Sequence, residues 1–247
     1  MKVEIWSDFV CPFCYIGKRR FEEALMQFPH REQVQMVFKS FELDPNADSS
    51  VRKSEIEMLA GKYGMSLEQA KGMTENVVQQ AAAVGLHFTF ENACVENTFH
   101  GHRLAHYAET QGKGLALTER LLKAHFTDNS PIGDYESLAN LAQEVGLNRT
   151  EALAVLESGQ YAEAVRADEE EASRLGVRGV PFFVFDRKFA VSGAQPAEVF
   201  LNALSKAWEE RNPVLTKIVG DENATLCEDG SCVVPGTDNS DAGGQEK

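Results

Sequence analysis

The first fifty residues alternate between the patterns of a strand, a helix and a second strand. In residues 2–7, Val3 and Ile5 lie on one side of the chain and Glu4 on the other, which is the two-residue repeat of a strand. Apolar residues then recur at helical spacing, at Phe13, Phe21, Ala24, Leu25 and Phe28. Residues 34–41 are rich in β-branched and aromatic side chains. This order predicts a right-handed βαβ unit with parallel strands.

Residues 51–176 carry one helical pattern after another. Ser54 with Glu57, and Ser66 with Gln69, fit the capping box that satisfies the free amides of a helix start. A helical apolar stripe occupies Leu138, Leu141, Ala142 and Val145 and ends at Gly146, and a second runs from Tyr161 to Gly176. We therefore expect an all-helical insertion in an α/β framework.

The framework resumes after the insertion. Pro181 interrupts the helical pattern, and residues 182–185 read as a buried strand. A polar turn at 186–188 leads into a second strand at 189–191, so the two strands predict a hairpin. Pro196 opens a last helix, whose apolar side carries Val199, Phe200, Ala203, Leu204, Ala207 and Trp208.

Three segments follow from these patterns. Residues 1–50 and 177–212 form the framework, 51–176 the inserted helical subdomain, and 213–247 an acidic tail.

The 247 residues have a net charge of −14, and residues 221–247 carry seven acidic side chains against one basic. Without aromatic residues, this stretch cannot bury enough apolar surface to offset ordering, so we expect a flexible tail. A surface of this sign repels phosphate backbones and anionic lipids, which argues against nucleic-acid and membrane roles.

Five cysteines direct attention to thiol chemistry; they are Cys11, Cys14, Cys94, Cys227 and Cys232. The start of the chain lacks an export signal, because Glu4 and Asp8 interrupt its apolar run, and no segment has the length of a membrane span. We therefore expect a cytoplasmic protein. In a reducing compartment, closely spaced cysteines are usually catalytic or metal-binding.

The motif Cys11-Pro12-Phe13-Cys14 lies between the first strand and the first helix. Proline suits a first helical turn, which places Cys11 at the helix N-terminus, where free amides and the helix dipole stabilise a thiolate. Cys14 follows one turn later and can attack a mixed disulfide on Cys11. The alternative is half of a zinc site completed by Cys227 and Cys232, but their four-residue separation is unusual for zinc ligands. We expect no metal site.

The sequence resembles the DsbA-like thioredoxin-fold oxidoreductases. The resemblance rests on the CPFC motif, on Gly179-Val180-Pro181-Phe182-Phe183 before the third strand, on the long insertion, and on the segments 97–104 and 190–196. It extends over nearly all of residues 2–210 and is closest to the cytoplasmic FrnE-like branch. It implies a thioredoxin fold (βαβ…ββα) with a large all-helical insertion.

The resemblance also assigns roles to residues. Pro181 is identified as the cis-proline beside the dithiol, which leaves the Val180 backbone free to pair with a substrate strand. An ordinary proline that begins a strand is the competing interpretation. Pro12 and Phe13 are expected on the substrate side. They lack the imidazole that strongly oxidising periplasmic members carry there, so we expect a reductase or isomerase within roughly −120 to −270 mV.

The predicted activity is thiol–disulfide exchange with protein or small thiol substrates. It requires no bound cofactor; glutathione or another thiol would donate electrons, and the partners would be protein disulfide substrates and a reducing partner. The sequence leaves the oligomeric state open. One rival is a glutathione-dependent isomerase resembling the 2-hydroxychromene-2-carboxylate isomerases, which place serine at the position of Cys11. The other is a non-enzymatic, chaperone-like binder of unfolded chains.

Several further residues invite hypotheses. Cys227 and Cys232 flank an Asp-Gly turn former, so we expect an accessory redox pair; two idle thiols or a metal-binding tail are the alternatives. Cys94 reads as a packed or free thiol. His102 and His106 are one turn apart near His100; we favour a structural or substrate-side surface role over metal ligation. Asp8 either tunes Cys11 or faces solvent.

Overall fold

The computed structural model describes residues 1–47, 54–90, 95–212, 227–228 and 231–232. The chain divides into two compact units, residues 1–211 and 212–247. Framework and insertion thus form a single unit. In the second unit, β5 (Cys227–Glu228) pairs antiparallel with β6 (Ser231–Cys232), and Cys227 lies opposite Cys232 in the register. The expected flexibility of the tail falls largely on residues outside the described ranges.

The first unit is built on a four-stranded mixed sheet of order β2-β1-β3-β4. The strands are β1 (Lys2–Ser7), β2 (Gln35–Ser40), β3 (Phe182–Phe185) and β4 (Phe189–Ser192). β1 pairs parallel with β2, so that Ser7 lies beside Ser40, and antiparallel with β3. Helix α1 (Pro12–Gln27) and a 3-10 turn (Arg31–Gln33) connect the parallel strands. These elements confirm the predicted βαβ unit and hairpin.

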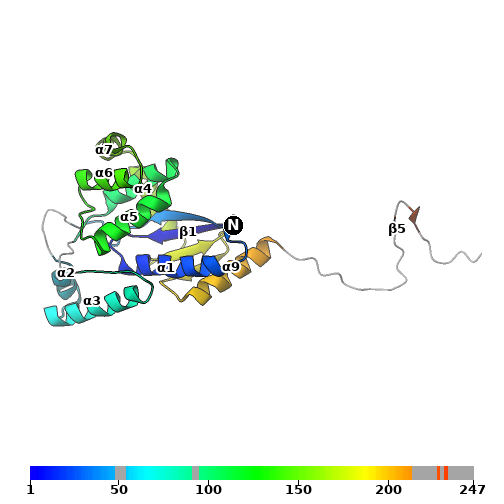
Figure 1. The fold of residues 1–247 in the computed structure, drawn as a ribbon, viewed down its shortest axis with the longest axis horizontal. Coiled ribbons are helices and arrows are strands. Elements are labelled where there is room, and N and C mark those ends of the chain that lie inside the picture. The colour runs from blue at the N-terminus through cyan, green and yellow to red at the C-terminus, as the bar shows by residue number, and fades with distance from the viewer. Residues whose placement is uncertain (48–53, 91–94, 213–226, 229–230, 233–247) are drawn as a thin grey trace, which may run out of the picture. The chain divides into compact units, whose positions relative to one another are not determined.

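Helices α1 and α9 (Ala197–Arg211) cover one face of the sheet (Figure 1). Val3 and Ile5 of β1 point into this layer, as their alternation predicts. The layer is rich in rings: the Phe200 centroid lies 5.8 Å from that of Phe21 and 4.6 Å from that of Phe183. Aromatic pairs contribute about 0.5–1.5 kcal/mol each beyond the area they bury. This packing holds α1, and therefore its N-terminus, against the sheet.

The insertion consists of seven helices within the described residues. They are α2 (Glu55–Tyr63), α3 (Leu67–Ala82), α4 (Phe99–Thr110), α5 (Gly114–Phe126), α6 (Tyr135–Glu144), α7 (Arg149–Ser158) and α8 (Ala162–Arg174). Both predicted capping boxes are present, at Ser54 and Ser66. The group α4–α7 lies on the side of the sheet opposite α1 and α9 (Figure 1).

Two buried side chains anchor the helical insertion through hydrogen bonds: one joins it to the sheet, and the other joins two of its helices. The Trp6 indole of β1 donates a hydrogen bond to the Asp168 carbonyl of α8 at 2.9 Å. Arg103 of α4, only 2% exposed, donates to the carbonyls of Val155, Leu156 and Gln160 around the C-terminus of α7. A cation at that position compensates the free carbonyls of a helix end.

Across the helices of the described ranges, none combines the length and apolar character required to cross a bilayer.

Candidate active site

The dithiol lies where β1 passes into α1. Cys11 is the N-cap of α1, in extended conformation, and Pro12 occupies the first helical position. The Cys14 amide donates to the Cys11 carbonyl at 3.0 Å, which closes the first turn. Both cysteines are free thiols, with 4% and 2% of their surface exposed. The Cys11 side chain lies at this helix start without a capping hydrogen bond to its amides.

The two thiols differ in their surroundings. Burial raises the pKa of Cys14 well above its usual value, and a hydrogen bond to Cys11 together with the charge on Cys11 raises it further. A hydrogen bond from Ser7 and the Asp8 amide act in the opposite direction. The raised pKa favours the protonated form of the Cys14 thiol. This asymmetry favours Cys11 as the attacking sulfur and Cys14 as the resolving one.

A loop from another part of the chain completes the site. The Cys11 thiol donates a weak hydrogen bond to the Val180 carbonyl at 3.6 Å. The Val180–Pro181 peptide bond is cis. A Cβ built on Gly17 of α1 would lie 3.0 Å from the Pro181 Cγ, so a side chain at this position would crowd the proline ring. The fold thus places residues 169 positions apart in contact, and the substrate-positioning role of Pro181 stays a prediction.

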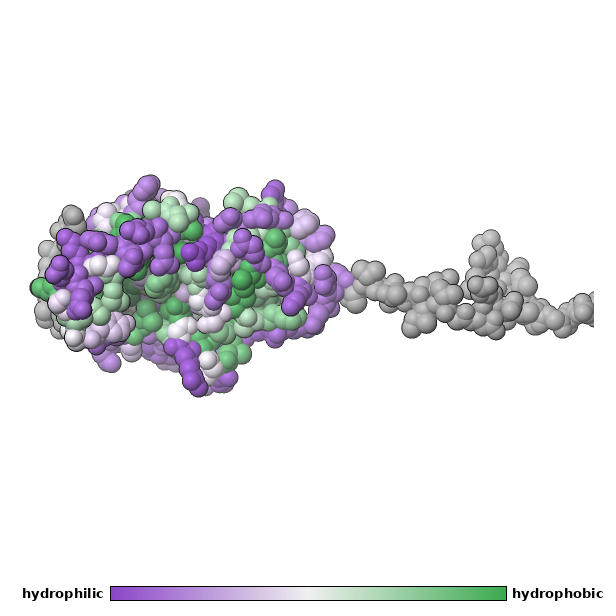
Figure 2. Space-filling model, turned by 90° about the horizontal axis from the view of Figure 1, so that it is seen from below, coloured by the Kyte–Doolittle hydropathy of each residue, from purple (hydrophilic) through white to green (hydrophobic). Residues whose placement is uncertain are grey.

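The residues between the two cysteines lie at the surface of the site. Phe13 is 39% exposed, and Pro12 is half-buried. The face formed by α1, α3 and α9 bears apolar areas bordered by polar side chains (Figure 2). Exposed apolar residues on these helices include Met26, Leu67, Met73 and Val199. The exposed Phe13 ring beside the dithiol suits contact with hydrophobic segments of a polypeptide.

Asp8 and His102 form a buried pair next to the dithiol. The Asp8 carboxylate accepts hydrogen bonds from the amides of Phe9 and Leu43, both at 2.8 Å, and lies 3.3 Å from His102 Nε2. Both residues are at most 3% exposed, and the His102 ring packs on Phe9. Asp8 therefore does not face solvent. Of the two roles expected for His102, its burial against β1 supports the structural one and contradicts the substrate-side surface one.

The other histidines of this helix have separate partners. His106 Nε2 lies 3.2 Å from Ser40 Oγ and 3.1 Å from Asp168, and His100 Nδ1 contacts Arg103 at 3.0 Å. Over the described ranges, no three His, Cys, Asp or Glu side chains are arranged to hold a metal ion.

Several sequence-predicted cysteines cannot be placed at this site. Cys94 lies outside the described residues. Cys227 and Cys232 face each other in the hairpin of the second unit, where only their backbone pairing is described. Their exchange with Cys11 and Cys14 stays a prediction. Sequence reasoning also missed Ser7, a buried residue that acts to lower the pKa of Cys14; a polar residue ending a buried strand four positions before Cys11 was the available signal.

Comparison with known proteins agrees with this geometry. The model of the DSBA-like thioredoxin domain matches residues 2–205. A probable DsbA oxidoreductase from Streptomyces coelicolor is 47% identical, with 96% of this chain and all of that one covered and a TM-score of 0.82.

Two more distant structures share the fold. A 2-hydroxychromene-2-carboxylate isomerase is 17% identical (85% and 98% covered, TM-score 0.64). The cytosolic disulfide reductase DsbM from Pseudomonas aeruginosa, solved with glutathione, is 18% identical (85% and 100% covered, TM-score 0.61). With a family model matching most of its length, the chain belongs to the DsbA-like thioredoxin-domain family, whose members are oxidoreductases or isomerases.

Proposed function

We propose that this protein is a protein disulfide reductase or isomerase that works through Cys11 and Cys14. The observation that carries the proposal is the asymmetric dithiol: Cys11 occupies the N-cap position of α1, and burial raises the pKa of the neighbouring Cys14 thiol. A thiol that keeps its proton beside a helix-capping cysteine is suited to resolve a mixed disulfide rather than to start the reaction.

The reaction would proceed in two exchange steps. The Cys11 thiolate attacks one sulfur of a substrate disulfide, forms a mixed disulfide and releases the other sulfur as a thiolate, which takes up a proton. Cys14 then loses its proton and attacks the Cys11 sulfur, releasing the second substrate thiol and leaving a Cys11–Cys14 disulfide. The substrate gains two electrons, and a thiol donor of the glutathione class returns them by reducing that disulfide.

Substrate alignment would come from the loop beside Cys11. The Val180 carbonyl already contacts the Cys11 sulfur, so a substrate strand paired with this backbone would bring its disulfide to the nucleophile. Proline at 181 donates no competing hydrogen bond. The exposed Phe13 ring and the Pro12 side chain would add apolar contacts. The site would therefore recognise extended polypeptide mainly by its backbone.

We further propose that the protein operates in the cytoplasm and in the reducing direction. Pro12 and Phe13 supply no cationic group to stabilise the reduced form of the dithiol, which favours a less oxidising pair. A cytosolic disulfide reductase shares the fold. Assignment to the FrnE-like branch is part of the same proposal.

The hairpin of the second unit would supply an accessory redox pair. Residues directly opposite in an antiparallel pair have Cα atoms about 4.5–5.5 Å apart, within the span that a disulfide bridges. The register of Cys227 and Cys232 supports such a bond. Serine at both positions should then lower the number of thiols oxidised per redox cycle from four to two.

Reduction of insulin disulfides by a thiol donor tests the proposal. We expect the wild type to accelerate precipitation of the insulin B chain, Cys11→Ser to abolish the acceleration, and Cys14→Ser to accumulate a mixed disulfide with insulin. Cys94→Ser is the matched control and should retain activity.

Two further measurements on the same variants separate the rival functions. Glutathione-dependent isomerisation that survives Cys11→Ser would favour the isomerase of the 2-hydroxychromene-2-carboxylate type. Suppression of aggregation that is indifferent to both cysteines would favour the chaperone-like binder.

A further inference from the structure

An open groove of about 480 Å³ lies beside the loop that carries the cis-proline. Its walls include Val180 and Pro181 of that loop, and Ser192 and Gly193 at the end of β4. The Val180 carbonyl accepts the weak hydrogen bond from the Cys11 thiol, so the groove adjoins the Cys11 sulfur. A substrate whose disulfide reaches Cys11 would therefore extend into this groove.

Arg178 is the charged side chain among the residues that line the groove. It is exposed and lies two positions before Val180. Every other arginine of the described ranges pairs with a carboxylate or donates to another acceptor, whereas Arg178 has no such partner there. The donors of this guanidinium are therefore available to a ligand in the groove.

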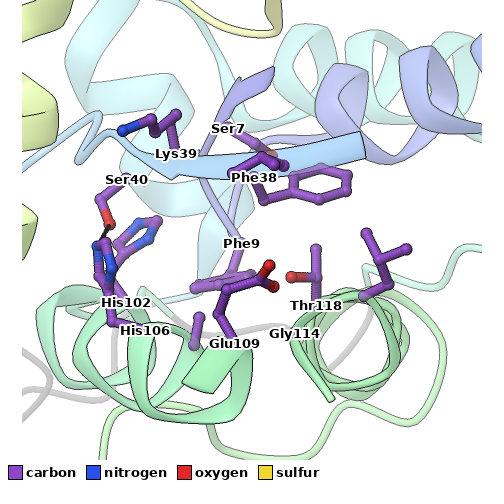
Figure 3. Close-up of a pocket in the computed structure, with 13 residues that line it drawn as sticks. Ser7, Phe9, Phe38, Lys39, Ser40, His102, His106, Glu109, Gly114 and Thr118 are labelled. Carbon is purple, nitrogen blue, oxygen red and sulfur yellow. Dashed lines mark hydrogen bonds between the residues drawn. The ribbon is translucent and has the colours of Figure 1, made fainter. Parts of the chain in front are cut away.

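Another cavity, of about 140 Å³, lies between β2 and the helices α4 and α5 (Figure 3). Its basic side chains are already engaged, because Lys39, His102 and His106 each lie within 3.3 Å of a buried aspartate. The Glu109 carboxylate also lines this cavity and would repel an anion. The cavity of Figure 3 is therefore a poor site for an anionic group, in contrast to the groove.

A carboxylate is the group that best fits the guanidinium in the groove. A guanidinium stays charged at physiological pH and can donate two parallel hydrogen bonds to a carboxylate. Disulfide substrates supply carboxylates either from Asp and Glu side chains of a polypeptide or from glutathione. The net charge of −14 opposes an acidic substrate, but charges farther away than about 8 Å are largely screened at physiological ionic strength. A direct contact with Arg178 acts at shorter range.

We propose that Arg178 is a specificity-determining residue that binds a carboxylate next to the substrate disulfide. The inference rests on the proposed dithiol function and adds the substrate class, which is disulfides flanked by acidic groups. Cys11 and Cys14 still carry out the exchange: two electrons pass to the substrate disulfide, and a thiol donor returns them. Arg178 orients the substrate and takes no part in electron or proton transfer.

Reduction of matched peptide disulfides by the full-length protein tests this assignment. Each peptide is a disulfide-linked homodimer that carries a self-quenching fluorophore, and three versions place Glu, Gln or Lys on both sides of the cysteine. Dithiothreitol donates the electrons because it is uncharged. Each kcat/KM is divided by the rate constant with dithiothreitol alone, which removes the effect of the flanking charges on the reactivity of the peptide itself.

We expect the wild type to prefer the Glu peptide over the Gln peptide about two- to fivefold, the range of an exposed ion pair. This Glu-to-Gln ratio should fall toward one at about 1 M salt, where the screening length is about 3 Å. Arg178→Gln should bring the ratio close to one at low salt, and Arg178→Glu should favour the Lys peptide over the Glu peptide. Arg174→Gln is the matched control: Arg174 has a side chain 68% exposed and does not line the groove, so the ratio should stay at the wild-type value.

A second arm compares oxidised glutathione with the neutral 2-hydroxyethyl disulfide. If Arg178→Gln loses only a preference for glutathione, the carboxylate that Arg178 binds belongs to glutathione. If the variant loses the Glu-to-Gln ratio of the peptides, the carboxylate belongs to a polypeptide substrate. Both results support the assignment.

Two results would overturn it. One is a Glu-to-Gln ratio and a glutathione preference that are the same in the wild type and in Arg178→Gln; the other is a preference for the Glu peptide that persists in Arg178→Glu. Partial unfolding of a variant lowers the rates for both peptides and leaves their ratio intact. If Cys11→Ser reduces every peptide as fast as the wild type, the dithiol function itself fails, which is a separate outcome.

Discussion

Asp168 of α8 ties the helical insertion to the edge of the sheet, and its removal should weaken the fold measurably. The carboxylate accepts hydrogen bonds from Lys39 Nζ at 2.7 Å and from the Ser40 amide at 3.0 Å, and it lies 3.1 Å from His106 Nε2. Its side chain is 5% exposed. Asp168→Ala removes the acceptor while Lys39 and the Ser40 amide stay in place.

The size of the loss follows from these contacts. Removal of one partner from a buried ion pair costs about 3–5 kcal/mol, because the other partner stays desolvated. Lys39 is 19% exposed and keeps Glu171 at 3.5 Å, which places the expected loss at the lower end, about 3 kcal/mol. For a unit of this size, that corresponds to about 6–12 °C in the melting temperature.

The loss should depend on pH in a defined direction. Burial acts to raise the pKa of Asp168, but hydrogen bonds from His106, Lys39 and the Ser40 amide outweigh it and hold the pKa below its usual value. Folding therefore favours the ionised form. The stability that Asp168 contributes should be complete above about pH 4 and disappear as the pH falls through the lowered folded pKa.

Denaturant unfolding of the wild type and Asp168→Ala from pH 7 to pH 2.5 measures both quantities. Glu170→Ala is the matched control: it lies on the same helix with a side chain 72% exposed and should change stability by less than about 0.5 kcal/mol. A loss below 1 kcal/mol at pH 7, or a loss that stays constant down to pH 2.5, would refute the assigned role.

Three other substitutions test separate contacts. Arg103→Leu leaves three carbonyls near the end of α7 without their donor and should cost about 3 kcal/mol or more in chemical denaturation. Burial acts to raise the pKa of Glu119, but hydrogen bonds from Arg19, Lys18 and Tyr15 outweigh it and lower this pKa to about 2. In unfolding titrations, Glu119→Gln should therefore be less stable than the wild type above about pH 4.5, and the two stabilities should converge toward pH 2. Gly17→Val inserts side-chain atoms against the loop that contacts Cys11 and should lower the rate of insulin reduction at temperatures where the variant is still folded. A loss of activity that appears only as the variant unfolds would argue against specific displacement of that loop.

The local elements were predictable because local patterns determine them. The alternation at Val3 and Ile5 and the capping box at Ser54 each depend on residues a few positions apart, and the structure confirms both. The identity of the dithiol was predictable for the same reason. Two cysteines one turn apart after a strand, with proline at the first helical position, require only short-range geometry.

The surroundings of the dithiol depended on contacts between distant segments. Sequence alone left Asp8 undecided and left His102 between a structural and a surface role, because the register of α4 against β1 cannot be read from either segment.

Sequence alone thus determined the order of elements, the family and the position of the paired thiols at the start of the first helix. Tertiary structure decided that both thiols are buried and which polar groups lie beside them. The physical reason is that helix caps, strand alternation and cysteine spacing are short-range properties, whereas desolvation and hydrogen bonding at a buried thiol depend on every segment packed around it.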